Sequence, residues 1–266
     1  MSHSLPLPVD VRLMNLTTSL LVGALLLGCV AAGLWWALRN PAFAIAQITV
    51  DGDTAHNSPA SLSASVVPKL AGNFFTMDLA AAQAAFRSAP WVRRATVRRE
   101  FPDRLDVTLQ EHVPVARWGA GDDRMVNTHG EVFEAPGGEA DEGMPTLTGP
   151  DVQAAELLAM YQRLNPLLAP LDTRIDELAL QPRGDWRAEL AQGAVIELGH
   201  GSAEELAARL TQFVATVKEV AARHQRAVDA IETADLRHPG GYALRLRGVS
   251  TVRADAANPP KPPIRR

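Results

Sequence analysis

The alternation of apolar and polar residues is clearest between Pro90 and Pro114, where the chain reads PWVRRATVRREFPDRLDVTLQEHVP. One face of the first half of this run carries Ala95, Val97, Arg99 and Phe101. One face of the second half carries Leu105, Val107 and Leu109. This period of two predicts a pair of half-buried strands. Pro102 and Asp103 favour a tight turn between them, because proline presets φ and Asp can hydrogen-bond its own backbone.

The residues before this hairpin add one strand and two helices. Residues 45–50 alternate like a strand, which ends at Asp51-Gly52-Asp53. Ser58-Pro59 is typical of a helix N-terminus, and Gly72 suits the C-cap of that helix. The apolar positions are Leu62, Val66 and Leu70 in the first helix, and Leu79, Ala82 and Phe86 in the second, which follows Asp78. The order strand, helix, helix, strand, strand predicts a compact α+β unit with its helices on one sheet face.

From Val115 onward, strands predominate. Short strands are predicted at 115–118, 124–127 and 131–134, and three more near 175–181, 186–190 and 194–198. The stretch 135–150 is rich in glycine, proline and acidic residues, so we expect it to be a solvated connecting loop.

Two helices and a last hairpin complete this half of the chain. Asp151 begins a helix whose candidate core positions are Ala155, Leu158 and Tyr161. Ser202 caps a long helix whose apolar stripe is Leu206, Leu210, Phe213, Val217 and Val220. The hairpin pairs 230–236 with 242–246 and turns through His238-Pro239-Gly240-Gly241. We expect disorder in the tail 249–266, which is rich in Ala, Pro and basic residues.

The N-terminal part of the chain is continuously apolar rather than alternating. Leu13 to Leu38 spans 26 residues without a charge, and Trp35 and Trp36 lie near its far end. A helix of that length reaches about 39 Å, more than the ~30 Å of a hydrocarbon core, so we predict a membrane-spanning helix. The alternative is a cleaved signal peptide, since Ala42-Phe43-Ala44 resembles a cleavage site. The apolar stretch exceeds the usual length of about 7–15 residues and no basic segment precedes it, which favours the anchor.

Charge and cysteine content bear on the orientation of the chain in the membrane, on disulfide bonds and on nucleic-acid binding. Arg12 and Arg39 flank the span and the next basic residue is Lys69, so the positive-inside rule does not decide the orientation. The short tail before the span and the long part after it favour export of the C-terminal part. The only cysteine, Cys29, lies within the span, so no disulfide is expected outside it. The net charge of −4 argues against general nucleic-acid binding.

Motifs that carry chemistry are missing from the sequence. No two of the seven histidines have the i,i+4 spacing of a helical metal site. Gly199-His200-Gly201-Ser202 lacks the GxSxG pattern, and Ser202 is explained as a helix N-cap. Glu111 and His112 are neighbours on a strand and therefore point to opposite faces. We predict a protein that is not an enzyme and has no cofactor or metal.

Two segments are candidates for binding. The hairpin arginines Arg93, Arg94, Arg98 and Arg99 form either a solvated strand face or a secondary basic surface for an acidic partner or anionic lipid. The last hairpin leaves unpaired backbone groups that another chain could use by strand addition. Tyr242 and Leu244 are candidate anchors there, and Gly240 and Gly241 permit close backbone approach. The alternative is an ordinary edge protected by Arg245 and Arg247.

In order and spacing, these segments resemble the FtsQ/DivIB family of bacterial cell-division proteins from the anchor to about Arg247. The residues that carry the resemblance are Gly72-Asn73-Phe74-Phe75, Asp78-Leu79, Pro90-Trp91-Val92, Val97-Arg98-Arg99, Phe101-Pro102-Asp103, Pro114-Val115-Ala116, Trp118, Gly130-Glu131-Val132-Phe133, Pro145-Thr146-Leu147, Trp186, Leu198-Gly199 and Asp235-Leu236-Arg237.

The resemblance implies an α+β protein of five parts. These are a cytoplasmic tail 1–12, a transmembrane helix 13–38, a POTRA domain 43–113 of order β-α-α-β-β, a C-terminal mixed β domain 114–248 with flanking helices, and the tail 249–266. It also implies a location in the inner membrane at the division septum, with the C-terminal region periplasmic. The runner-up is another POTRA-type periplasmic chaperone or secretion and assembly module.

The resemblance further implies a non-enzymatic scaffold that binds FtsB and FtsL, with contacts to FtsW, FtsI, FtsK and FtsN. FtsB would add as a strand along Arg237, His238, Gly240, Gly241, Tyr242, Ala243 and Leu244. The family usually has a tyrosine after Asp-Leu-Arg, whereas this chain has His238. An aromatic contact at position 238 is therefore not carried over, although Tyr242 could replace it.

Overall fold

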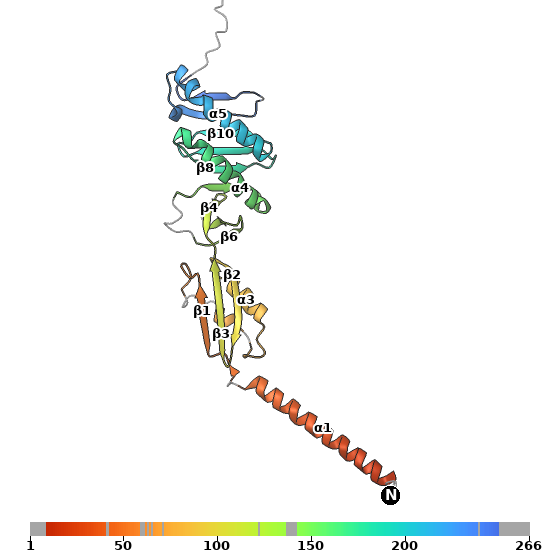
Figure 1. Ribbon diagram of the computed structural model, residues 1–266. Helices are drawn as coiled ribbons and strands as arrows, with labels where there is room; N and C mark the ends of the chain where they lie inside the picture. The colour runs from red at the N-terminus through yellow and green to blue at the C-terminus, as the bar shows by residue number, and fades with distance from the viewer. Residues whose placement is uncertain are drawn as a thin grey trace, which may run out of the picture. The chain divides into compact units, whose positions relative to one another are not determined.

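A computed structural model describes residues 9–40, 43–58, 62, 64, 66–70, 72–121, 123–136, 143–238 and 240–249 of the chain. The chain divides into two compact units, Met1–His112 and Val113–Arg266 (Figure 1). The predicted disorder of the tail 249–266 falls almost wholly outside the described residues.

The first element is the helix α1, Val9–Arg39, drawn in red in Figure 1. Its stretch Leu13–Trp36 has 24 residues whose apolar side chains are exposed. Among the described residues it is the one helix long and apolar enough to cross a membrane. The helix predicted from the uncharged run is confirmed.

The rest of the first unit is a three-stranded sheet with helices on one face. Its strands are β1 (Gln47–Gly52), β2 (Val92–Glu100) and β3 (Arg104–Glu111), in the order β1-β3-β2. β3 pairs in parallel with β1 and antiparallel with β2, so the predicted hairpin is confirmed. The helical elements are the 3₁₀ turn η2 (Val67–Lys69) and the helix α3 (Leu79–Arg87).

The core of this unit follows the predicted pattern. Phe86 from α3 packs with Leu62 and Val66 against the strand side chains Val97, Leu105, Val107 and Leu109. The carboxylate of Asp78 caps α3 by accepting from the backbone N–H of Ala80, 2.8 Å away. Residues 59–61, 63 and 65 of the first predicted helix lie outside the described residues.

One expected position in this hairpin was wrong. Phe101 was placed on the buried face with Ala95 and Val97, but its side chain is 74% exposed. The reason is that β2 ends at Glu100, so Phe101 lies in the turn, beyond the helices that cover the strand. Strand β1 also continues through Asp51 and Gly52, where the sequence suggested its end.

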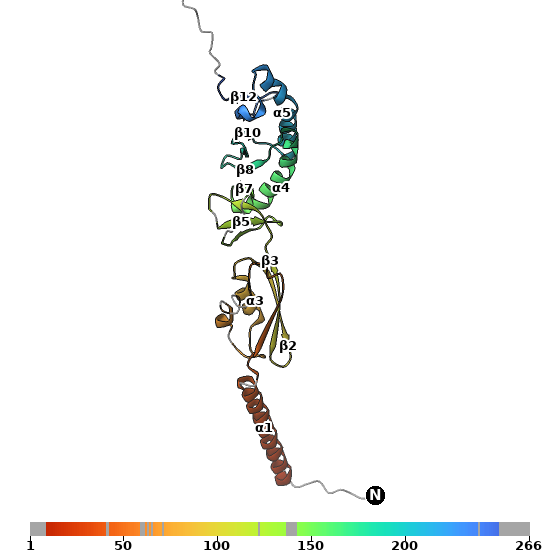
Figure 2. The same cartoon turned by 90° about the vertical axis from the view of Figure 1, so that its left-hand side faces the viewer.

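The second unit is built on a mixed sheet of nine strands in the order β12-β11-β10-β9-β8-β7-β4-β5-β6. The strands are β4 (Pro114–Trp118), β5 (Arg124–Asn127), β6 (Val132–Glu134), β7 (Thr146–Thr148), β8 (Ile175–Leu180), β9 (Trp186–Leu190), β10 (Val195–Gly199), β11 (Ile231–Asp235) and β12 (Ala243–Leu246). The helical elements are η4 (Asp151–Gln153), α4 (Ala154–Leu164), η5 (Asn165–Leu171), α5 (Ala203–Arg223) and η6 (Val228–Ala230). Figure 2 shows α4 and α5 on one face of this sheet, which confirms the α+β class.

The core of the second unit lies between these helices and the sheet. Ser202 and Glu205 form a reciprocal capping box at the start of α5, which fixes where this helix begins. The apolar stripe of α5 is buried at Leu206, Leu210, Phe213 and Val217, as predicted. Trp118 is also buried, and its indole N–H donates to Asp151 Oδ1 over 2.8 Å.

Three expectations for this unit need correction. The stretch 135–150 contains strand β7, which a three-residue strand beside Gly and Pro does not announce in the sequence. Ala155 is exposed, because η4 precedes α4 and rotates the buried face onto Ala154 and Leu157. At the end of α5, Ala221 is buried and Val220 is only half-buried.

Candidate binding edge at β12

The strand β12 closes one end of the nine-stranded sheet and, among the described strands, pairs with β11 alone. The backbone N–H of Leu236, next to the end of β11, donates to Glu197 O on β10. Because the backbone groups of successive residues in a strand point to opposite sides, those of Asp235 and Thr233 point toward β12. These two residues lie opposite Ala243 and Arg245. The N–H and C=O of Leu244 therefore face away from β11. A backbone donor and a backbone acceptor are thus available at this edge.

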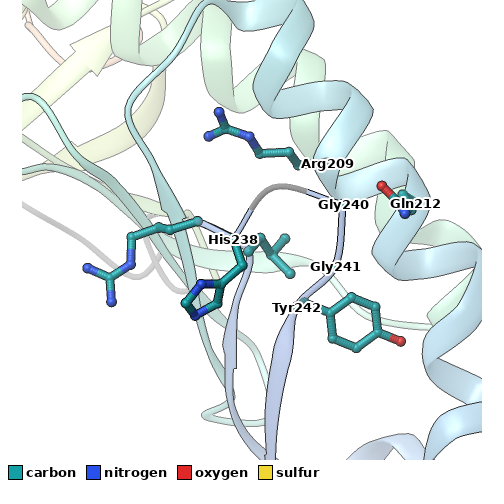
Figure 3. Close-up of a pocket in the computed structure, with 8 residues that line it drawn as sticks. Arg209, Gln212, His238, Gly240, Gly241 and Tyr242 are labelled. Atoms are coloured by element: carbon teal, nitrogen blue, oxygen red, sulfur yellow. The ribbon is translucent and has the colours of Figure 1, made fainter.

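The side chains of β12 determine what a partner would meet. Leu246 is buried and Leu244 is half-buried against the core. The ring of Tyr242 stands edge-on to Phe213, with centroids 5.1 Å apart, and its hydroxyl lies 2.9 Å from Thr216 Oγ1. Figure 3 shows Tyr242 beside α5. Tyr242 is therefore positioned by α5 and stays half-buried, with part of its surface open to solvent.

A hollow of about 150 Å³ lies between α5 and the β11–β12 turn (Figure 3). Its lining residues are Arg209, Gln212, Leu236, Arg237, His238, Gly240, Gly241 and Tyr242. A Cβ atom at Gly240 or Gly241 would meet no other atom within 4 Å, so the turn is open to close approach. Gly240 has a φ of +77°, which glycine adopts freely.

Two arginines beside this hollow are fixed by hydrogen bonds. Arg209 Nη1 donates to the carbonyls of Leu198 and His200, each 2.9 Å away. Arg237 donates to both carboxylate oxygens of Asp235, at 2.9 and 2.6 Å. Hydrogen bonding from Arg237 lowers the pKa of Asp235 to about 2. The pair Asp235–Arg237 therefore stays ionised at neutral pH and holds the Arg237 guanidinium at the start of the turn.

Arg237→Ala is expected to return the pKa of Asp235 from about 2 toward its usual range near 3.9. The pKa of Asp235 is lower in the folded than in the unfolded protein. The pair therefore stabilises the fold at pH values above about 3.9, the unfolded pKa, and this contribution is lost as the pH falls through the folded pKa of about 2. Carboxyl titration by NMR measures the shift. Arg245→Ala is the control, since Arg245 pairs with Glu232 over 3.0 Å instead. An unchanged Asp235 pKa in Arg237→Ala would contradict this assignment.

The sequence predicted some of these residues and missed others. Arg237, His238, Gly240 and Gly241 line the hollow, while Ala243 and Leu244 form the first half of β12. Arg209 and Gln212 were missed, because they lie on α5 and nothing local in the sequence links them to the last hairpin. The acid–base pair considered for Glu111 and His112 does not form, since Glu111 bonds to His56 and Asn57.

The contacts of Glu111 fasten a loop to the end of β3 in the first unit. Its buried carboxylate accepts from the backbone N–H groups of His56 and Asn57 and from Asn57 Nδ2, each about 3.0 Å away. The His56 Nδ1 atom lies 3.0 Å from Glu111 Oε2. The His56 ring also stacks on the Trp91 ring, with the two centroids 3.9 Å apart. Burial alone raises the pKa of Glu111, but the hydrogen bonds from His56 and Asn57 outweigh it, and the pKa is lowered. We interpret this network as structural.

The four hairpin arginines do not share one face. Arg94 and Arg98 lie on the open face of the sheet, where Arg98 is opposite Asp106. Arg99 turns to the other side and donates to Met77 O over 2.5 Å. Arg93 lies at an irregularity between β2 and β3. Elsewhere, no cluster of three or more His, Cys, Asp or Glu that could hold a metal ion occurs among the described residues.

Together, these features define a single-pass membrane protein whose main part is an α+β unit followed by a mixed-sheet unit with an open strand edge. Residues 43–112 match the family model of the FtsQ-type POTRA domain, and residues 116–237 match that of the C-terminal region of cell division protein FtsQ/DivIB. The chain is 42% identical to cell division protein FtsQ of Burkholderia pseudomallei, over 90% of this chain and 94% of that protein. It is 38% identical to cell division protein FtsQ of Thiomonas arsenitoxydans, over 91% and 90% of the two chains. The chain belongs to the FtsQ/DivIB family of cell division proteins.

Proposed function

We propose that this protein is a scaffold of the division machinery that receives the periplasmic segment of FtsB as an added strand along β12. The single observation that carries the proposal is the edge at Leu244, whose N–H and C=O face away from β11. A partner backbone can bond to these groups without displacing any bond of the sheet. FtsL joins the complex, and FtsW, FtsI, FtsK and FtsN are further contacts that the family resemblance supports.

The geometry favours β12 over β6, which closes the other end of the same sheet. β6 has three residues and β12 has four. The open turn at Gly240 and Gly241 and the hollow beside it adjoin β12, so a partner residue that leaves the new strand finds space there. The proposed binding residues are Arg237, His238, Gly240, Gly241, Tyr242, Ala243 and Leu244, and α5 positions the ring of Tyr242.

The orientation is part of the same proposal. Residues 1–12 lie in the cytoplasm, α1 crosses the inner membrane, and the regions 43–113 and 114–248 lie in the periplasm at the septum. Binding is the function of the exported part, without catalysis, cofactor or nucleic acid. Calorimetric titration of the full chain in nanodiscs with the FtsB periplasmic segment tests the partner. A one-to-one complex supports the proposal, and no detectable heat or complex at saturating segment contradicts it.

A second surface is proposed on the open face of the first unit, narrowed to Arg94 and Arg98, because Arg99 bonds to Met77 inside the unit. It serves an acidic partner segment other than FtsB. Charge reversal, Arg94→Glu with Arg98→Glu, is expected to change FtsB-segment affinity by less than about twofold, since β12 belongs to the other unit and exposed charges outside a contact contribute little to it. The same variant is expected to lower the septal fraction of a fluorescent fusion. A normal septal fraction would identify these arginines as an ordinary solvated face.

A further inference from the structure

Four phenylalanines form a connected cluster in the first unit. Phe43 meets Phe75 at 5.0 Å between ring centroids, Phe75 meets Phe74 at 5.3 Å, and Phe74 meets Phe101 at 6.1 Å. Phe74 is buried, but Phe75 and Phe101 are 47% and 74% exposed. None of the four belongs to the core under α3. The cluster therefore presents the apolar rings of Phe75 and Phe101 to solvent, on a base formed by Phe43 and Phe74.

Backbone contacts hold the cluster at the same end of the unit as the N-terminal helix. Phe74 N–H donates to Phe43 O over 2.9 Å, and Ala46 N–H donates to Asp103 O in the β2–β3 turn. Phe43 follows Arg39, the last residue of α1, by four positions. Whatever path the link takes, four residues reach at most about 14 Å. The cluster is thus tethered close to the end of the membrane helix.

That end of α1 has the composition of a membrane interface. Trp35 and Trp36 are 61% and 65% exposed within the last turns of the helix, and such rings favour the headgroup layer. The headgroup region adds about 5–7 Å to each side of the hydrocarbon core. Phe43 is within about 14 Å of the helix end and Phe75 packs directly on it, so the cluster can reach this layer without any change in the fold of the unit.

The charges near the cluster indicate which kind of partner could contact its exposed rings. Arg99 and Arg104 flank Glu100 and Asp103 around the turn that carries Phe101, so this turn has no net charge to attract an acidic or a basic peptide. Exposed aromatic side chains beside a membrane span are typical of contact with the lipid interface.

We propose that the Phe43–Phe74–Phe75–Phe101 cluster docks on the lipid bilayer and inserts Phe75 and Phe101 into the interface beside α1. This contact rests on the membrane span and not on the FtsB proposal. It anchors the first unit to the bilayer at a second point besides the helix. The unit then keeps a fixed side toward the lipid instead of rotating freely on its link.

Fluorescence quenching by lipid tests the contact in the full chain. Cys29→Ser leaves no cysteine, and Glu100→Cys then carries an environment-sensitive dye beside Phe101 while all four phenylalanines stay in place. The labelled protein is placed in nanodiscs with phospholipids that carry a nitroxide near the headgroup. The dye is expected to shift to shorter wavelength and lose fluorescence, because an apolar surface inserts about 5–10 Å into the interface.

The control label is at Ala55→Cys, an exposed position next to His56, which is bonded to Glu111 at the far end of β3. The eight residues of β3, from Arg104 to Glu111, make seven steps of about 3.3 Å and separate the two ends by about 23 Å. The label at position 55 is therefore expected to keep its fluorescence. Equal quenching at 55 and 100 would mean non-specific collapse onto the lipid and would overturn the proposal.

Removing the two exposed rings shows whether the rings themselves or only the link to α1 brings the β2–β3 turn to the lipid. Phe75→Ser with Phe101→Ser is expected to abolish the quenching at position 100, whereas Val152→Ser, which removes a 93% exposed side chain in the second unit, leaves it unchanged. Quenching that persists in the double variant would show that the tether alone brings the turn to the lipid, and would overturn the proposal. A shift to shorter wavelength without nitroxide quenching would indicate burial against protein and would also overturn it.

Discussion

Leu244→Pro is expected to weaken binding of the FtsB segment by about 10- to 100-fold. Proline removes the N–H that faces away from β11, so the partner carbonyl opposite it is buried without a donor, which costs about 1–3 kcal/mol. The bonds between β11 and β12 stay intact, because they use Ala243 and Arg245 on this strand. Proline is tolerated on an edge strand when its missing N–H faces outward. Calorimetric titration measures the affinity.

Leu244→Ala is the matched control for this variant. It removes the half-buried side chain but keeps the N–H, so it is expected to lower the affinity much less than proline does. Unfolding curves of the two variants show whether the unit itself is equally stable. If proline and alanine weaken binding to the same extent, side-chain contacts hold the partner and the strand-addition account is wrong.

Glu111→Ala is expected to destabilise the first unit by about 3–5 kcal/mol, since removing a buried carboxylate leaves its donors without a partner. The donors are the backbone N–H groups of His56 and Asn57 and the Asn57 amide, and Glu111 itself is 6% exposed. Denaturant unfolding of the full chain in detergent measures the loss. A change under about 0.5 kcal/mol, the range of ordinary surface substitutions, would contradict the role of this network.

Glu111→Gln is the conservative variant at the same position, and it removes the carboxylate charge while keeping a side chain of similar size. In the folded protein the pKa of Glu111 is lowered from the reference value of 4.5. The ionised carboxylate therefore stabilises the fold at pH values above about 4.5, and this stabilisation is lost as the pH falls below that value. Wild type should therefore lose stability more steeply than Glu111→Gln on acidification from about pH 5. Parallel pH curves for the two proteins would show that the carboxylate charge contributes nothing.

The elements with strong periodicity could be predicted from the sequence. Leu105, Val107 and Leu109 alternate on β3, and Ser202 with Glu205 marks the start of α5, so local patterns were sufficient for both. The resemblance to the FtsQ/DivIB family is confirmed by the matches over both units. The division of the chain at 113 and 114 and the binding residues at the last hairpin stay predictions.

The positions that sequence reasoning missed depend on tertiary contacts. Phe101 continues the alternation of β2, yet the strand stops one residue earlier and leaves its ring exposed. The contacts of Tyr242 with Phe213 and Thr216 on α5 were not foreseen, and its role as an anchor for a partner stays a prediction. Arg209 joins the hollow only because α5 packs beside the last hairpin. None of these contacts is encoded by spacing along the chain.

Amide hydrogen exchange at Leu244, with and without the FtsB segment, tests the central claim most directly. In the free protein this N–H faces away from β11 and should exchange rapidly. In the complex it is expected to exchange at least about tenfold more slowly, because the partner strand accepts its hydrogen bond. The amide of Val132 on β6, at the other end of the sheet, should not change. Unchanged exchange at Leu244 while the segment is bound would contradict strand addition at β12.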